Sequence, residues 1–140
     1  MTWQLEAYRG VIVATALLTL VAGCQWLPTA VSPVPIHYVA IEDGVSDADL
    51  RAKAGEEVRW VNVRKSPVSV VFNGLQPGQL SCKRGFSASA DAHLTAVMHP
   101  DDNASLCFSA AGRQTYRVLD AQRPGLELNH EVTVEIVPAP

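Results

Sequence analysis

Hydrophobic and polar residues alternate in short runs from Ile36 to Val137, and turn residues interrupt the runs about every ten positions. Such alternation is typical of β-strands that bury one face. It is clearest in the last run, EVTVEIV, where Val132, Val134 and Ile136 share one face. The pattern predicts strands over 36–41, 48–53, 57–63, 68–73, 93–98, 105–110, 114–119 and 131–137. With no sustained helical period, the sequence predicts an all-β, Greek-key sandwich of about seven or eight strands.

The same alternation predicts which residues enter the core. In EVRWVNV, the side chains of Val58, Trp60 and Asn62 fall on one face. We expect Trp60, Met98 and the penultimate strand's Tyr116 to be buried between the two sheets.

The first 35 residues follow a different pattern. Arg9 precedes an apolar run of about 13 residues, which suits a signal peptide and is short of the roughly 20 needed to span a bilayer. The run ends in Val-Ala-Gly before Cys24, which resembles a bacterial lipobox. An ordinary secretory signal or an uncleaved anchor is the alternative. We therefore expect a lipoprotein signal peptide at 1–23, a lipidated Cys24 within a proline-rich tether at 24–35, and one domain at 36–140.

Charge and cysteine content indicate which partners and which cellular compartment suit the protein. The formal net charge is −3, and removal of residues 1–23 takes away one acid and one base, leaving it unchanged. A mildly acidic domain has no electrostatic footprint for nucleic acid. In an oxidising compartment Cys82 and Cys107 predict a disulfide, with a thiolate pair for a metal as the alternative. Gln25 after Cys24 favours the outer membrane, facing the periplasm.

Two segments resemble the cupredoxins, the plastocyanin-like copper proteins. They are AGEEVRWVN (54–62) and SPVSVVF (66–72), and the closing region 110–136 also resembles the family. The resemblance implies a cupredoxin-like sandwich. It also implies a copper site of two histidines, one cysteine and a weak methionine, a ligand set that suits a redox-active copper ion.

The ligand positions implied by the resemblance carry other residues here. Val68, Asp120, Arg123 and Leu128 occupy them. We therefore expect no type 1 copper and no other cofactor, and a face presenting Arg64, Lys65, Asp120 and Arg123. Asp120 could pair with Arg123 or Arg64 there, but separately solvated loop charges are the favoured interpretation.

Two functions follow as hypotheses. No enzyme motif is present, so we expect a non-enzymatic binding or scaffold module of the cell envelope, contacting the membrane through its lipid and an envelope protein as partner. The alternative is a copper carrier or electron-transfer protein that uses His93, Met98 and His99 as a non-standard site. That alternative requires the three side chains to converge in space.

Overall fold

The structure is a computed structural model that describes residues 32–140. The predicted signal peptide, the lipidation site Cys24 and the tether up to residue 31 lie outside the described residues. Ser32 to Pro35 have no regular secondary structure. No helix in residues 32–140 is long and apolar enough to cross a membrane.

Ten strands and one short 3₁₀ helix follow, and their alternating apolar residues explain where each strand lies. Their bounds are β1 (Ile36–Ile41), β2 (Asp49–Lys53), β3 (Glu57–Asn62), β4 (Val68–Asn73), η1 (Pro77–Gln79), β5 (Leu80–Arg84), β6 (Ser87–Ala88), β7 (His93–Met98), β8 (Asn103–Phe108), β9 (Gly112–Asp120) and β10 (Glu127–Val137).

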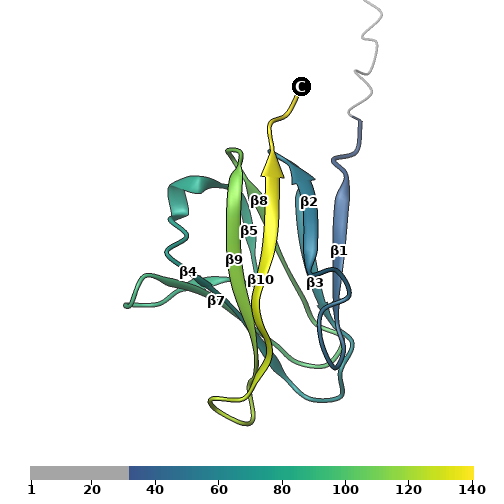
Figure 1. The fold of residues 1–140 in the computed structure, drawn as a ribbon, viewed down its shortest axis with the longest axis vertical. Helices are drawn as coiled ribbons and strands as arrows, with labels where there is room; N and C mark the ends of the chain where they lie inside the picture. Colours follow the sequence, from purple (N-terminus) through teal and green to yellow (C-terminus); the bar gives the residue numbers. More distant parts are fainter. Residues whose placement is uncertain (1–31) are drawn as a thin grey trace, which may run out of the picture. The chain divides into compact units, whose positions relative to one another are not determined.

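The strands form two sheets packed face to face. One sheet has the order β1-β3-β8-β5, and the other has the order β2-β10-β9-β4-β7-β6 (Figure 1). β1 pairs with β3 and β2 pairs with β10 in parallel, whereas the remaining neighbours are antiparallel. The predicted all-β sandwich is confirmed.

Aromatic side chains fill the space between the sheets. Trp60 of β3 packs edge-on against Phe72, Phe86 and Tyr116, with ring centroids 5.4–5.5 Å apart. Trp60, Phe72, Tyr116 and Met98 are each at most 2 % exposed. Val132, Val134 and Ile136 also face inward. The predicted core residues are therefore buried, and every member of the core cluster lies between residues 39 and 136.

Several predicted boundaries differ from the structure. The strands predicted at 48–53, 57–63 and 114–119 lie at Asp49–Lys53, Glu57–Asn62 and Gly112–Asp120. β8 begins at Asn103 and not at 105, and β10 begins at Glu127 and not at 131. β5 and β6 were not predicted as strands at all, so Cys82, expected in a loop, lies in β5.

The two ends of the sandwich are built from different segments of the chain. Four connections meet at one end, which we call the loop pole: 42–48, 63–67, 99–102 and 121–126. The opposite end, the termini pole, holds the start of β1 and the end of β10 (Figure 1). A six-residue strand such as β1 spans about 20 Å, which is roughly the separation of the two poles.

Candidate functional site

The loop pole brings together the residues that the sequence assigned to the missing copper site. Val68, at the start of β4, pairs with Asp120 at the end of β9 on one side and with Met98 at the end of β7 on the other. Val68 is fully buried, and Met98 and Asp120 are each 2 % exposed. The position implied for a histidine ligand is therefore filled by an aliphatic side chain packed into the core.

Asp120 is buried at this pole as an ion, contrary to the favoured interpretation of separately solvated charges. One carboxylate oxygen, Oδ2, accepts hydrogen bonds from Arg123 Nε at 3.2 Å and Nη2 at 2.8 Å. The other, Oδ1, accepts from the backbone N–H groups of Gln122 at 3.0 Å and Arg123 at 3.1 Å. The Arg123 hydrogen bonds, assisted by these backbone donors, lower the pKa of Asp120 despite its burial. The carboxylate holds the β9–β10 connection closed.

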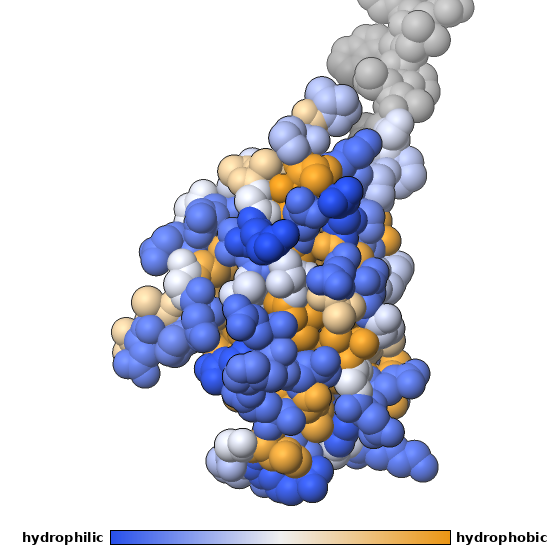
Figure 2. Space-filling view, viewed as in Figure 1, coloured by the Kyte–Doolittle hydropathy of each residue, from blue (hydrophilic) through white to orange (hydrophobic). Residues whose placement is uncertain are grey.

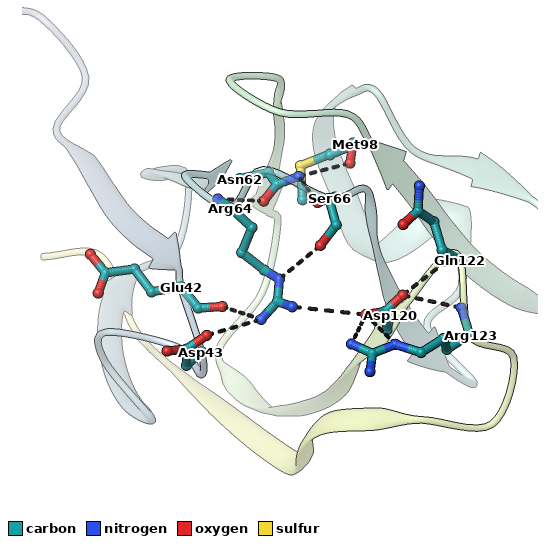
Figure 3. Close-up of polar contacts among 9 residues, drawn as sticks. All are labelled: Glu42, Asp43, Asn62, Arg64, Ser66, Met98, Asp120, Gln122 and Arg123. Carbon is teal, nitrogen blue, oxygen red and sulfur yellow. Dashed lines mark hydrogen bonds and ion pairs between the residues drawn. The ribbon is translucent and has the colours of Figure 1, made fainter.

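Arg64 joins separate segments of the loop pole. Its side chain is 14 % exposed, and its Nη2 lies 3.8 Å from Asp120 Oδ2 (Figure 3). Nη1 donates to the backbone carbonyl of Glu42 at 2.8 Å and lies 3.5 Å from the carboxylate of Asp43, while Nε lies 3.4 Å from the Ser66 hydroxyl. One guanidinium thus links the 42–48 connection, its own 63–67 connection and the end of β9.

Asn62 is a site residue that the sequence pattern placed on the core face without assigning it a role. It is fully buried at the end of β3. Its amide nitrogen donates to the carbonyls of Ser66 and Met98, each at 3.0 Å, and its amide oxygen accepts from the backbone N–H of Arg64 at 3.0 Å (Figure 3). These three bonds satisfy a buried amide and fix the 63–67 connection against β7. The polar residue on an otherwise apolar strand face was the only signal in the sequence.

The other predicted face residues lie at the surface of the same pole. Arg123 has a side chain that is 66 % exposed, and Lys65 is also exposed. An open depression of about 520 Å³ adjoins Arg64 and is lined by Glu42, Asp43, Val63, Arg64, Lys65 and Ser66. The structure therefore brings the four predicted face residues to one pole, where Arg123 and Arg64 lie near the buried Asp120 carboxylate and Lys65 lies at the surface beside Arg64.

The donor set of the pole does not fit a type 1 copper ion. Val68 and Leu128 offer no ligand atom, and Arg123 carries a cation. Asp120, the one carboxylate among the four implied ligand positions, already accepts four hydrogen bonds. Among residues 32–140, no group of three or more His, Cys, Asp or Glu side chains is placed to hold a metal.

The residues of the alternative copper site do not converge. His93 begins β7 and His99 follows its last residue, so about six residues, or roughly 20 Å of strand, separate them. Met98 points into the core, whereas His99 has a 73 % exposed side chain whose Nδ1 lies 3.5 Å from Asp102.

The Cys82–Cys107 disulfide is confirmed, which decides against the thiolate alternative. It joins the neighbouring strands β5 and β8, with 4.8 Å between the two Cα atoms. This bond lies in the four-stranded sheet, away from the residues of the loop pole.

Comparisons with known proteins support the fold alone. No protein-family model and no curated protein matches the sequence. Solved structures do: an oxidized amicyanin mutant is 22 % identical, with a TM-score of 0.50 over 72 % of this chain and 81 % of that one. A second oxidized amicyanin mutant is 21 % identical, with a TM-score of 0.50 over 73 % and 82 %. The class defined by the sandwich is thus the cupredoxin-like fold. The particular proteins that it resembles are amicyanins.

Proposed function

We propose that this chain is a membrane-anchored, cupredoxin-like lipoprotein that acts as a non-enzymatic binding module of the cell envelope, without type 1 copper. In this proposal Cys24 carries the lipid, and the domain faces the periplasm from the outer membrane. The loop pole contacts an envelope protein.

The observation that carries the proposal is the ionic closure of the loop pole. Asp120 is buried, paired with Arg123 and adjoined by Arg64, at the pole where the resemblance would put the metal. These contacts cross-link the connections without a metal. A prearranged set of loops at the end of a rigid sandwich is a common way to build a recognition surface, because little ordering entropy is lost on binding.

The position of the first strand of the domain supports the proposed orientation. Ile36 begins β1 at the termini pole, and the tether would enter there. With Cys24 lipidated, the loop pole would point away from the membrane and remain free for a partner.

Metal content is the first test. We would titrate residues 25–140 with Cu(I) and Cu(II), beside a His93→Ala/His99→Ala double variant. The proposal expects a colourless protein that binds copper no more tightly than the double variant. Stoichiometric copper that the double variant loses would instead establish the copper-carrier alternative.

Site-specific photo-crosslinking in the cell envelope tests the binding role. A photoreactive residue at Lys65 lies on the loop pole, and a matched one at the exposed Lys53 lies at the termini pole. We expect position 65 to crosslink a discrete protein other than this chain, and position 53, which lies near β1, to crosslink no other protein. Crosslinks from position 53 alone, or from neither position, would contradict the assigned face.

A further inference from the structure

The two sheets leave four edges, and the edge strand β1 differs from the other three. β2 presents Asp49, Arg51 and Lys53, all exposed, and β5 presents Lys83 and Arg84. β6 is only two residues long. Charged side chains and short length both discourage a further strand from adding to an edge. β1, with the sequence IHYVAI, contains no Asp, Glu, Lys or Arg.

The hydrogen-bonding direction of β1 leaves part of its backbone unpaired. Pro35 and Ile41 accept hydrogen bonds from Glu57 and Val63, so the odd-numbered residues of this parallel strand face β3. Even-numbered residues therefore direct their N–H and C=O groups toward the open edge. At Ala40 these groups bond to Ser46.

The outward N–H and C=O groups of Ala40 are thus paired, whereas those of Ile36 and Tyr38 are free. Val34 precedes Pro35, which favours an extended backbone at Val34, so we take it to continue the same alternation. Within residues 32–140, no backbone group pairs with these three residues on that side. The nitrogens of Pro33 and Pro35 belong to the side that faces β3, so their missing N–H groups do not interrupt the free edge.

Apolar side chains accompany this free backbone. Val34 is 54 % exposed, Ile36 38 % and Tyr38 58 %, and spacing by two places them on one face of the strand. The guanidinium of Arg59 lies 5.6 Å from the centre of the Tyr38 ring and holds it in place. Apolar residues reach the surface along the side of the molecule on which β1 lies (Figure 2).

We propose that this edge, residues 34–38, is a dimerisation site at which β1 pairs antiparallel with β1 of a second copy of the chain. A twofold axis through Ile36 sets Ile36 opposite Ile36 of the second copy, and Val34 opposite Tyr38. This register uses all the free N–H and C=O groups of the three residues, in six hydrogen bonds. Because the backbone groups of Ala40 already bond to Ser46, the strand pairing cannot extend to Ala40, and the register is centred on Ile36.

Self-complementarity identifies a second copy as the occupant. An antiparallel pair of identical strands closes on itself, so the assembly stops at two chains. The side-chain pairs it creates are aliphatic with aliphatic and aromatic with β-branched, both favourable across strands, and no like charges meet. A lipid anchor would also confine the chains to a surface and raise their effective concentration.

The test compares the mass of residues 25–140 in solution with that of edge variants, by light scattering and sedimentation. This fragment contains every residue of the core cluster, so it should fold. Ile36→Pro removes an N–H that β3 does not use and should weaken dimerisation at least about tenfold while leaving the fold intact. Ile36→Lys should do the same by placing charges opposite each other. Val97→Lys, at a strand residue that is 58 % exposed elsewhere, should leave the dimer unchanged.

Cysteine crosslinking tests the register. Ile36→Cys should form a disulfide-linked dimer with itself, since directly opposite Cα atoms lie about 5.5 Å apart. Tyr38→Cys alone should not, but it should link to Val34→Cys in a mixture. A wild-type protein that stays monomeric at millimolar concentration, or a dimer that neither Ile36 variant weakens, would overturn the proposal. Binding of foreign extended peptides without self-association would also overturn it.

Discussion

The buried polar side chains of this protein differ in how many hydrogen-bond partners they have. Asn62 makes three side-chain hydrogen bonds at the loop pole, and Asp120 accepts four. In the core, by contrast, the hydroxyl of Tyr116 and the indole nitrogen of Trp60 are buried without a hydrogen-bond partner. The buried polar groups that fix the loops therefore have hydrogen-bond partners, whereas the aromatic side chains of the core are held by packing.

Because the buried hydroxyl of Tyr116 has no hydrogen-bond partner, Tyr116→Phe should not destabilise the protein. Removing a buried group that has no partner should be neutral or should stabilise by up to about 1 kcal/mol at neutral pH. Burial raises the pKa of Tyr116 from 10.0 to about 12, so the folded state holds this proton more tightly than the unfolded state. The resulting stability is complete below pH 10 and is lost as pH rises through about 12. Denaturation of wild type and variant between pH 8 and about 12 measures this, and a parallel loss in both proteins would contradict it.

The ion pair between Asp120 and Arg123 predicts that Arg123→Ala destabilises the protein. Without Arg123, the buried carboxylate of Asp120 keeps two neutral backbone donors, of which one belongs to residue 123 itself, and the more distant Arg64. Its pKa should rise, and stability should fall at neutral pH. Because Arg123 lowers the pKa of Asp120 below 3.8, the difference from wild type should shrink as pH falls through that lowered value.

The matched control for that variant is Arg51→Ala. Arg51 forms a similar two-donor pair with Glu135, but the Glu135 side chain is 40 % exposed, whereas that of Asp120 is 1 % exposed. Exposed pairs of this kind contribute about 0–1 kcal/mol, so urea denaturation should show a smaller loss than for Arg123→Ala. An equal loss in both variants would mean that the burial of Asp120 does not matter.

The sequence could place the site residues but not their state of ionisation or burial. The resemblance assigned Val68 and Asp120 to one site, and the strand register does bring them side by side. The alternation of Tyr116 and Val118 continues to Asp120 on the buried face, but the predicted strand ended at 119, so Asp120 was assigned to a solvated loop. Its ionic surroundings also include Arg64, which is distant in the chain and lies 3.8 Å from the Asp120 carboxylate only in the folded sandwich.

At the scale of elements, the strands β1, β2, β3, β4 and β7 were predicted to within one residue at each end, and irregular strands were not. β1, β4 and β7 coincide with their predicted ranges. β5, with the sequence LSCKR, is mostly exposed on the sheet edge and therefore carries no alternation to detect. The start of β10 was missed because register shifts between Glu127 and Val132 break the period of two.

The edge position of β5 predicts a large effect of its disulfide. β5 pairs with β8 alone, and the Cys82–Cys107 bond crosses that single pairing. Replacing both cysteines by serine should destabilise the protein by about 2–4 kcal/mol, mostly by freeing the unfolded chain. Hydrogen exchange should rise first in β5 and the adjoining η1, whereas β4 and β9 in the other sheet stay protected. Uniform loss of protection would show that β5 has no separate stability.

At the scale of the whole molecule, the sandwich has a complete core and an ionically closed pole, so its stability should not depend on a metal. Copper that binds only the folded state would raise stability by about 2.7 kcal/mol at a hundredfold excess over its Kd. We expect the midpoint of thermal unfolding of residues 25–140 to be the same in EDTA and in excess Cu(II). A rise with Cu(II) would contradict the metal-free proposal at once.

Restoring the first implied ligand should not restore the metal. Val68→His places an imidazole at a fully buried position between Met98 and Asp120, and we expect a loss of about 2 kcal/mol or more from overpacking and unsatisfied polarity. Copper should not recover this loss, because Asp120 supplies no thiolate, Arg123 no imidazole and Leu128 no thioether at the other implied positions. Val97→His, exposed on β7, controls for weak surface binding of copper by any added histidine. If Cu(II) stabilises the Val68→His protein and not the Val97→His protein, the pole has kept a copper-binding geometry, and the ionic closure around Asp120 must open readily enough to admit the ion.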